Sequence, residues 1–205
     1  MTIVEEIKKL RESSKKRNFT QRFDLVVTFK DMDIKKPENQ IDELLFLPKI
    51  PGKPPSITIF SDSVKKMEKA RIVSGNDIEK IAKNKKQRKE LIKSTSLFLS
   101  EPKLMPVVGK HLGRYLAPIN RMPTPVVGDL KENIGDYQKA IRISIKKHPM
   151  IQLPVGSEDM DDKDVGENIK KAVDFLQKKL PRGRNNISNV YLKLTMSKPL
   201  KLEAW

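Results

Sequence analysis

The first quarter of the chain carries one helical pattern followed by two strand patterns. Apolar residues recur at helical spacing from Ile3 to Leu10, which predicts an amphipathic helix. Segments 23–30 and 41–47 are rich in β-branched and aromatic residues and are predicted strands. Because a proline-containing turn at 36–39 separates them, we expect these two strands to pair antiparallel.

The middle of the chain follows a different pattern, after a proline-rich stretch at 48–55 that marks a domain crossing. Strands are predicted at 57–60, 71–73 and 97–99, and helices at 62–67, 76–82 and 87–93. Alternation of this kind is typical of a parallel sheet covered by helices. We therefore expect a small Rossmann-like domain.

Glycine, proline and cationic residues crowd the segment 109–125 that follows. Prolines fix φ and remove backbone donors, and glycines weaken helices and strands. The pattern therefore predicts a basic loop of fixed conformation whose apolar residues pack against a core. After it we expect a helix at 130–139 and a strand at 140–146 that ends the inserted domain.

The last quarter of the chain complements the first. Strands are predicted at 150–155 and 188–196, and a helix at 165–179 whose dipole is matched by acidic residues at 159–164. The expected fold is α/β (α+β) with two domains. Residues 1–56 and 150–205 form a discontinuous α+β domain with an antiparallel sheet, and residues 57–149 form the inserted Rossmann-like domain.

Charge narrows the class of partner. The chain has 42 Lys and Arg residues against 26 Asp and Glu, a formal net charge of +16, which favours a polyanion as partner. The absence of cysteine excludes disulfides and cysteine zinc sites. Because the sequence has no apolar run near the roughly 20 residues of a membrane span and no signal-peptide pattern, we expect a cytoplasmic protein without membrane contact.

Ionisable residues do not form a recognisable catalytic or cofactor pattern. His111 and His148 are the only histidines and lie far apart in the sequence. Lys110 follows Gly109, but a phosphate-binding loop would need glycine where Leu104 stands and Ser or Thr after the lysine. We therefore expect no cofactor, no metal and no catalytic residue.

Two basic stretches lie near opposite ends of the chain. No acidic residue occurs from Gln177 to Leu202, and four cations flank Phe19. If the two ends share one domain, these stretches can form a single basic rim, although a charge run can also be only a solvated face. The cations of the two stretches are Lys15, Lys16, Arg17, Arg22, Lys178, Lys179, Arg182, Arg184, Lys193, Lys198 and Lys201.

Four ordered motifs carry a family resemblance. They are Phe19-Thr20-Gln21-Arg22-Phe23-Asp24, Leu47-Pro48-Lys49, Gly109-Lys110-His111-Leu112-Gly113 through Met122-Pro123-Thr124-Pro125, and Leu194-Thr195-Met196-Ser197. Together they resemble the ribosomal protein L1 family, the universal first protein of the large ribosomal subunit, in its archaeal form. The bacterial pattern has asparagine where Thr124 stands and glycine where Ser197 stands.

The resemblance implies a protein of the mobile stalk beside the tRNA exit site, where it binds rRNA and assists release of deacylated tRNA. It also implies repression of the protein's own translation through a similar structure in its mRNA leader, contact with exit-site tRNA, and a monomer outside the ribosome. No reaction is catalysed by the family.

Carried onto matching positions, the resemblance assigns recognition to Phe19, Thr20, Thr195, Met196 and Ser197. Short hydroxyl side chains can read the 2′-hydroxyls of RNA, and Phe and Met can pack on sugars or bases. From the pattern alone, Phe19 could equally belong to a core, and Met196 on an alternating strand is more typical of a core residue than of a ligand contact. The cations that we expect around this centre are Arg17, Arg22, Lys193 and Lys198.

An alternative function is a small Rossmann-like enzyme that acts on a nucleotide or RNA. Such an enzyme would need a glycine-rich phosphate turn after strand 57–60, whereas this turn is Ser61-Asp62-Ser63. The residues therefore favour the RNA-binding protein.

Overall fold

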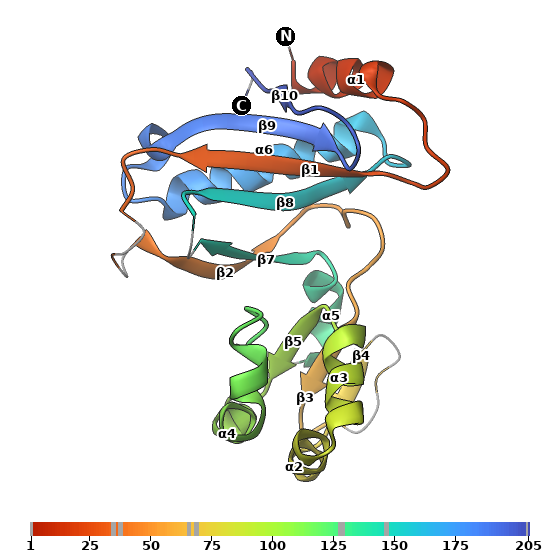
Figure 1. Cartoon of the computed structure of the whole chain (residues 1–205), viewed down its shortest axis with the longest axis vertical. Coiled ribbons are helices and arrows are strands. Elements are labelled where there is room, and N and C mark those ends of the chain that lie inside the picture. The colour runs from red at the N-terminus through yellow and green to blue at the C-terminus, as the bar shows by residue number, and fades with distance from the viewer. Residues whose placement is uncertain are drawn as a thin grey trace. The chain divides into compact units, whose positions relative to one another are not determined.

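The chain forms two compact units, which Figure 1 shows in one cartoon. The terminal unit comprises Met1–Pro54 and Lys139–Trp205, and the inserted unit comprises Pro55–Gln138. The computed structural model describes residues 2–33, 36, 39–64, 67, 70–126, 130–145, 148–203 and 205. Within these ranges, none of the helices has the length and apolar character needed to cross a membrane.

The terminal unit is built on a four-stranded antiparallel sheet in the order β10-β9-β1-β8. The strands are β1 (Arg22–Phe29), β8 (Met150–Ser157), β9 (Ile187–Leu194) and β10 (Leu200–Lys201). Alternate residues of β1, from Phe23 to Phe29, are buried, and the residues between them are partly exposed. This period of two places one face of the sheet against the core.

Two helices supply the rest of that core. The helix α1 (Ile3–Ser13) and the helix α6 (Asp162–Lys179) contact each other and pack on the sheet. Their apolar stripes form one cluster with the buried side chains of β1, β8 and β9. The helix α6 begins three residues earlier than its apolar pattern predicts, because the carboxylates of Asp162 and Asp164 in its first turn are favourable at the positive end of the helix dipole.

The predicted pairing of the first two strands is wrong. The strand β2 (Ile41–Phe46) pairs with β7 (Ala140–Ile145), while both edges of β1 are taken by β8 and β9. Burial of the apolar face decides such pairing, and nearness in sequence does not. Because β7 is hydrogen-bonded to β2, it belongs to the terminal unit. The expected end of the inserted domain at residue 149 is therefore too late, since the chain returns to the terminal unit between Gln138 and Lys139.

The inserted unit has the parallel sheet that the alternating pattern predicts. Its strand order is β4-β3-β5-β6 and every pairing is parallel. All residues of β3 and β5 are buried, as expected for strands covered on both faces. The elements are β3 (Ile57–Phe60), β4 (Ala70–Val73), α2 (Gly75–Lys83), α3 (Lys85–Ser94), β5 (Leu97–Ser100), α4 (Met105–Leu116), β6 (Thr124–Pro125) and α5 (Leu130–Tyr137). Short 3₁₀ helices occur at Pro102–Leu104 here and at Gly183–Asn186 in the terminal unit.

The first part of the predicted basic loop is helical. The helix α4 covers Met105–Leu116 and buries Val108, Leu112 and Leu116 at a spacing of four. Its proline lies in the first turn, where the missing N–H costs nothing. The apolar stripe therefore outweighs the low helix propensity of two glycines, and the rest of the segment, 117–125, is turn and extended chain that ends in the short strand β6.

The segment 62–67 is not helical at its described residues 62–64 and 67; residues 65 and 66 lie outside the described ranges. Asp62 instead caps a different helix, because its Oδ1 accepts a hydrogen bond from the backbone N–H of Gly75, the first residue of α2, at 2.7 Å.

A buried amide anchors the chain that follows β2, shortly before it crosses to the inserted unit. The Asn168 side chain of α6 is fully buried. Its Oδ1 accepts from the backbone N–H of Lys49 at 3.0 Å, and its Nδ2 donates to the carbonyls of Lys49 at 3.2 Å and of Val155 at 2.8 Å. One side chain therefore ties α6, β8 and the chain after β2 together.

Replacing this amide tests its role. We expect Asn168→Ala to lower the free energy of unfolding of the terminal unit by about 3 kcal/mol, because buried backbone groups lose their partners. Urea denaturation followed by circular dichroism measures the change. Glu167→Ala, at an exposed position next to it in α6, is the control and should stay within about 0.5 kcal/mol of the native chain. An equally small effect of Asn168→Ala would contradict the role.

Candidate nucleic-acid interface

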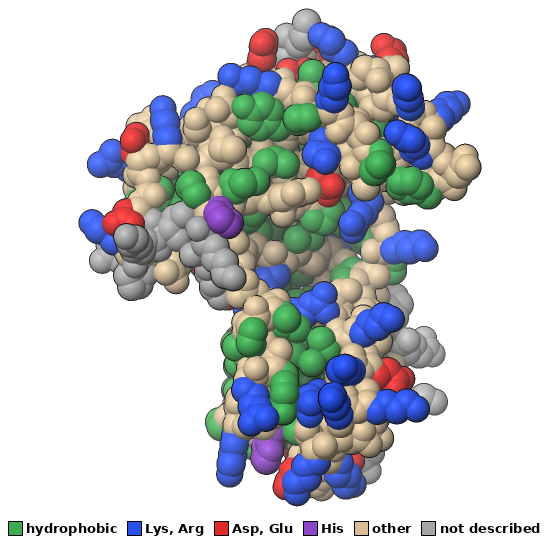
Figure 2. All heavy atoms as spheres, viewed as in Figure 1, with side chains coloured by type: hydrophobic (Ala, Val, Ile, Leu, Met, Phe, Trp, Pro, Cys, Tyr) green, Lys and Arg blue, Asp and Glu red, His purple; other side chains and the backbone are tan. Residues whose placement is uncertain are grey.

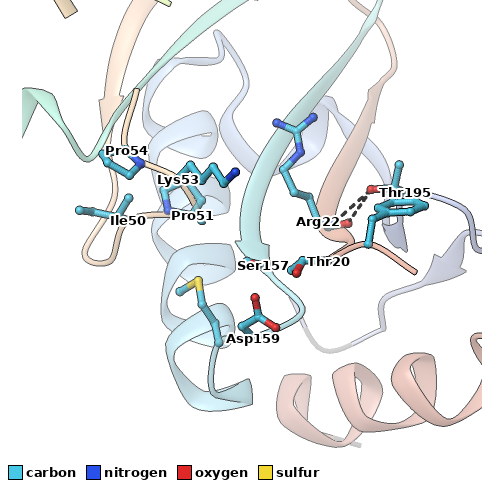
Figure 3. Close-up of a pocket in the computed structure, with 12 residues that line it drawn as sticks. Thr20, Arg22, Ile50, Pro51, Lys53, Pro54, Ser157, Asp159 and Thr195 are labelled. Atoms are coloured by element: carbon cyan, nitrogen blue, oxygen red, sulfur yellow. Dashed lines mark hydrogen bonds between the residues drawn. The ribbon is translucent and has the colours of Figure 1, made fainter. Parts of the chain in front are cut away.

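The two ends of the chain meet where the inner strands β1 and β9 of the terminal sheet begin and end. Phe23 near the start of β1 is paired in register with Leu194 at the end of β9. The Thr195 backbone N–H donates to the Arg22 carbonyl at 3.1 Å, and the Arg22 N–H donates to Thr195 Oγ1 at 3.1 Å (Figure 3). Segments more than 170 residues apart in sequence, 19–22 and 195–198, are therefore direct neighbours.

Gln21 joins these two segments to the loop before α6, a role that its residue type does not predict. Its side chain is 1% exposed, and its Oε1 accepts from the Met196 N–H at 3.2 Å. Its backbone N–H donates to the Glu158 carboxylate at 3.0 Å and its carbonyl accepts from the Glu158 N–H at 2.8 Å. A glutamine carries no sequence signal for such a role, because only the tertiary contacts make it one.

Phe19 and Met196 are surface residues. Their side chains are 51% and 59% exposed, so neither belongs to the core, which was the open alternative for both. Thr20 and Thr195 are exposed as well. Large apolar side chains at the surface, close to exposed hydroxyls, are typical of a binding surface.

Ser197 stabilises the turn after β9. Its Oγ accepts from the Leu194 N–H at 2.8 Å and donates to the Lys198 carbonyl at 3.1 Å. Within the described residues, the non-glycine residues with positive φ are Asp31 and Asn120. Serine is therefore accommodated at position 197 without backbone strain, and its hydroxyl is engaged within the chain.

A cavity of about 760 Å³ opens beside this junction in the terminal unit (Figure 3). Four residues expected to bind RNA line it: Phe19, Thr20, Arg22 and Thr195. The rest of the lining comprises the crossing segment 50–54 and residues Ser157, Asp159 and Met160. Sequence patterns did not indicate this part of the lining, because its prolines indicated only a linker and its acidic residues only a helix start.

The expected cations differ in position. Arg17, Arg22 and Lys198 are exposed, Lys193 is half-buried on β9, and none of the four forms an ion pair with another described residue. Of the four, only Arg22 lines the cavity. Figure 2 shows Lys and Arg side chains distributed over the visible face, with acidic side chains sparse among them.

Arg11 is a cation with a structural role. Its Nε donates to Asp162 at 2.7 Å, its Nη atoms donate to the carbonyls of Glu158 and Met160, and its guanidinium lies 4.9 Å from the centre of the Phe23 ring. Arg11 therefore fixes the loop 158–160 that forms one wall of the cavity.

The inserted unit has its own carboxylate at the position where open α/β sheets bind ligands. The strand order reverses between β3 and β5, which makes their carboxyl ends the switch point. There the Ser61 hydroxyl donates to Glu101. Burial raises the pKa of Glu101, but hydrogen bonds from Ser61, Ser63 and the backbone of residues 62 and 63 outweigh it, so the pKa lies below 4.5. A carboxylate at this switch point is unfavourable for binding a phosphate group, because both are anions.

Comparison with known proteins identifies the family. Residues 10–198 match the family model described as ribosomal protein L1p/L10e family. The chain belongs to this ribosomal protein family. The resemblance inferred from the four motifs is confirmed.

Individual relatives agree with this assignment over almost the whole chain. The chain is 36% identical over 209 residues to the large ribosomal subunit protein uL1 of Thermococcus kodakarensis, covering 98% of this chain and 96% of that one. It is 37% identical over 201 residues to the protein of the same name from Methanobrevibacter smithii, with 95% of each covered. The corresponding protein of Methanosphaera stadtmanae is 38% identical over 201 residues, again with 95% of each covered. These relatives are archaeal, as the residues of the four motifs predict.

The Glu101 contacts predict how stability depends on pH. A carboxylate whose pKa is lower in the folded than in the unfolded chain stabilises the fold above its unfolded pKa, near 4.5, and this contribution is lost as the pH falls through the folded pKa. We expect Glu101→Gln to destabilise the inserted unit at pH 7, and the difference from the native chain to shrink as the pH falls below 4.5.

Denaturant titrations at several pH values measure this effect. Glu90→Gln, which changes an exposed glutamate of α3, is the matched control and should show no such pH-dependent difference. A Glu101→Gln difference that is constant across the pH range would contradict the prediction.

Proposed function

We propose that this chain is a structural component of the large ribosomal subunit that binds rRNA at the mobile stalk, beside the tRNA exit site. The family and its relatives support the coarse assignment. The finer one rests on the motif resemblance and on the surface at the two chain ends.

One observation carries the proposal. Residues 19–22 and 195–198 lie side by side next to a cavity, with two exposed apolar side chains, exposed threonines, and cations that form no ion pair with a described residue. Cations supply sequence-independent affinity for phosphates, while neutral side chains at the centre supply discrimination.

The residue types suit structured RNA. Thr195 Oγ1 accepts from the Arg22 N–H at 3.1 Å and donates to the Arg22 carbonyl at 3.5 Å, so its remaining lone pair can accept from a ribose 2′-hydroxyl. Thr20 offers a second exposed hydroxyl. Hydroxyl groups can recognise the 2′-hydroxyls that distinguish RNA from DNA, and Phe19 and Met196 can pack against sugars or bases.

The same surface would serve translational repression, because an mRNA leader with a similar structure would present the same groups to it. Contact with exit-site tRNA, and help in releasing deacylated tRNA, would involve the inserted unit. On α4 the exposed Gly109 and the half-buried Gly113 lie beside Lys110 and Arg114, with open space around both glycines. Arg121 has a structural role, since its Nη1 donates to the carbonyls of Ile92 and Thr95.

Footprinting on large-subunit rRNA tests the proposal directly. We expect the purified protein to protect nucleotides of the stalk helices and few others. Protection scattered over the rRNA, without a stalk footprint, would overturn it.

Thr195→Ala and Met196→Ala test the recognition centre. Each should weaken binding to a stalk RNA fragment by about 1 to 3 kcal/mol, and should reduce the preference over an unrelated duplex RNA, because a specific contact is lost. Equilibrium filter binding of both RNAs measures the effect. Ser188→Ala, which removes an exposed hydroxyl near the other end of β9, should leave both affinities unchanged. Equal losses for the two RNAs in Thr195→Ala would exclude a specific role.

Lys198→Ala tests the basic surroundings. We expect it to weaken binding of both RNAs alike, since a phosphate contact carries no sequence information. The slope of log K against log salt concentration should become shallower by about one. Titrations at several salt concentrations measure the slope. Lys171→Ala on the exposed face of α6 is the charge-matched control, and a slope reduced equally by both variants would argue against a local contact.

A further inference from the structure

Five acidic residues lie between Glu158 and Asp164, and three of them have structural partners. Glu158 accepts from the Gln21 N–H at 3.0 Å, Asp162 pairs with Arg11 at 2.7 Å, and Asp164 pairs with Lys49 at 3.5 Å. Asp161 occupies the N-cap position of α6. Asp159 has no hydrogen bond or ion pair with another described residue.

The chain nevertheless holds Asp159 in a defined place. The Glu158 N–H donates to the Gln21 carbonyl at 2.8 Å, and the Met160 N–H donates to the Ser157 carbonyl at 3.0 Å. The Arg11 Nη2 donates to the Met160 carbonyl at 2.6 Å. Both neighbours of Asp159 are therefore anchored, and an anchored loop presents its side chain with little loss of entropy on binding.

The Asp159 side chain lines the cavity of the candidate interface. In Figure 3 its carboxylate points toward Thr20 and Ser157, while Arg22 and Lys53 supply the cationic part of the lining. A carboxylate here repels phosphate groups. It lowers the general affinity for RNA at the surface that the chain would use to bind it.

A carboxylate accepts hydrogen bonds and cannot donate them. Its complement in RNA is a donor: the ribose 2′-hydroxyl or a base N–H group. Among the bases, guanine fits a carboxylate best, because its N1–H and 2-amino groups are adjacent donors on the Watson–Crick edge. A hydrogen bond to a charged acceptor is roughly twice as strong as a neutral one. A phosphate, or a base edge that only accepts, is rejected at the same position.

We propose that Asp159 is a specificity-determining residue of the RNA interface, which accepts a hydrogen bond from a donor group of the bound RNA inside the cavity. This inference rests on the proposed function. Arg22 and Lys53 hold the flanking phosphates, and Asp159 selects the nucleotide between them.

The variant Asp159→Asn removes the charge and keeps the shape of the side chain. We expect its affinity for a stalk rRNA transcript to fall about tenfold, whereas its affinity for an unrelated duplex RNA stays the same or rises about twofold, because a repulsive charge is gone. Asp161→Asn makes the same charge change at an exposed position that does not line the cavity. It should leave the preference between the two RNAs unchanged. Equal unfolding midpoints establish that both variants are folded.

Modified transcripts identify the donor. Inosine in place of guanosine removes the 2-amino group, and 2′-deoxynucleotides remove the hydroxyl, at stalk positions protected by the native chain. The substitution that deletes the donor should weaken native binding about tenfold and have no further effect on Asp159→Asn.

The outcomes distinguish a failure of the proposed function from a failure of the role of Asp159 alone. A native chain that does not prefer the stalk transcript overturns the proposed function, and the role of Asp159 with it. Suppose instead that the native chain prefers this transcript and that Thr195→Ala reduces the preference. If Asp159→Asn then raises the affinity for both RNAs equally, only the role of Asp159 is overturned.

Discussion

The antiparallel pairing of β1 with β9 is the constraint on which the rest of the terminal unit depends. The register of Phe23 with Leu194 brings residues 19–22 against residues 195–198. A slip of one residue would turn Phe23, Leu25 and Val27 away from the core and separate the two motifs. The same hydrophobic burial that stabilises the sheet therefore also assembles the candidate interface.

The loop before α6 completes this arrangement through polar contacts. Gln21 joins the start of β1 to Glu158 and to Met196, and Arg11 of α1 holds the carbonyls of the same loop. Asn168 anchors the chain that leaves β2. The cavity walls thus come from four separate segments, and each is fixed by buried or half-buried hydrogen bonds. Such preorganisation reduces the entropy that binding must overcome.

Much of the fold follows from local patterns. The alternation in β1 and β9, the parallel sheet of the inserted unit and the helices α1, α2, α3 and α6 agree with the spacing of apolar residues. The prediction failed for α4, because it gave the glycine and proline content more weight than the apolar stripe. In the structure the stripe of Val108, Leu112 and Leu116 is buried and the segment is a helix. The prediction also failed for β2 and β7, because the partner of a strand is selected by packing between residues about 100 positions apart.

The sequence by itself determined the family, the basic character of the surface and the residue types at the two chain ends, since motifs and charge are properties of the linear chain. Only the tertiary structure decided that Phe19 and Met196 lie at the surface, that Ser197 stabilises a turn, and that Asp159 lines the cavity. These outcomes depend on which side of a sheet or loop a side chain occupies. That choice follows from long-range packing and from the competition for hydrogen-bond partners, which local spacing does not record.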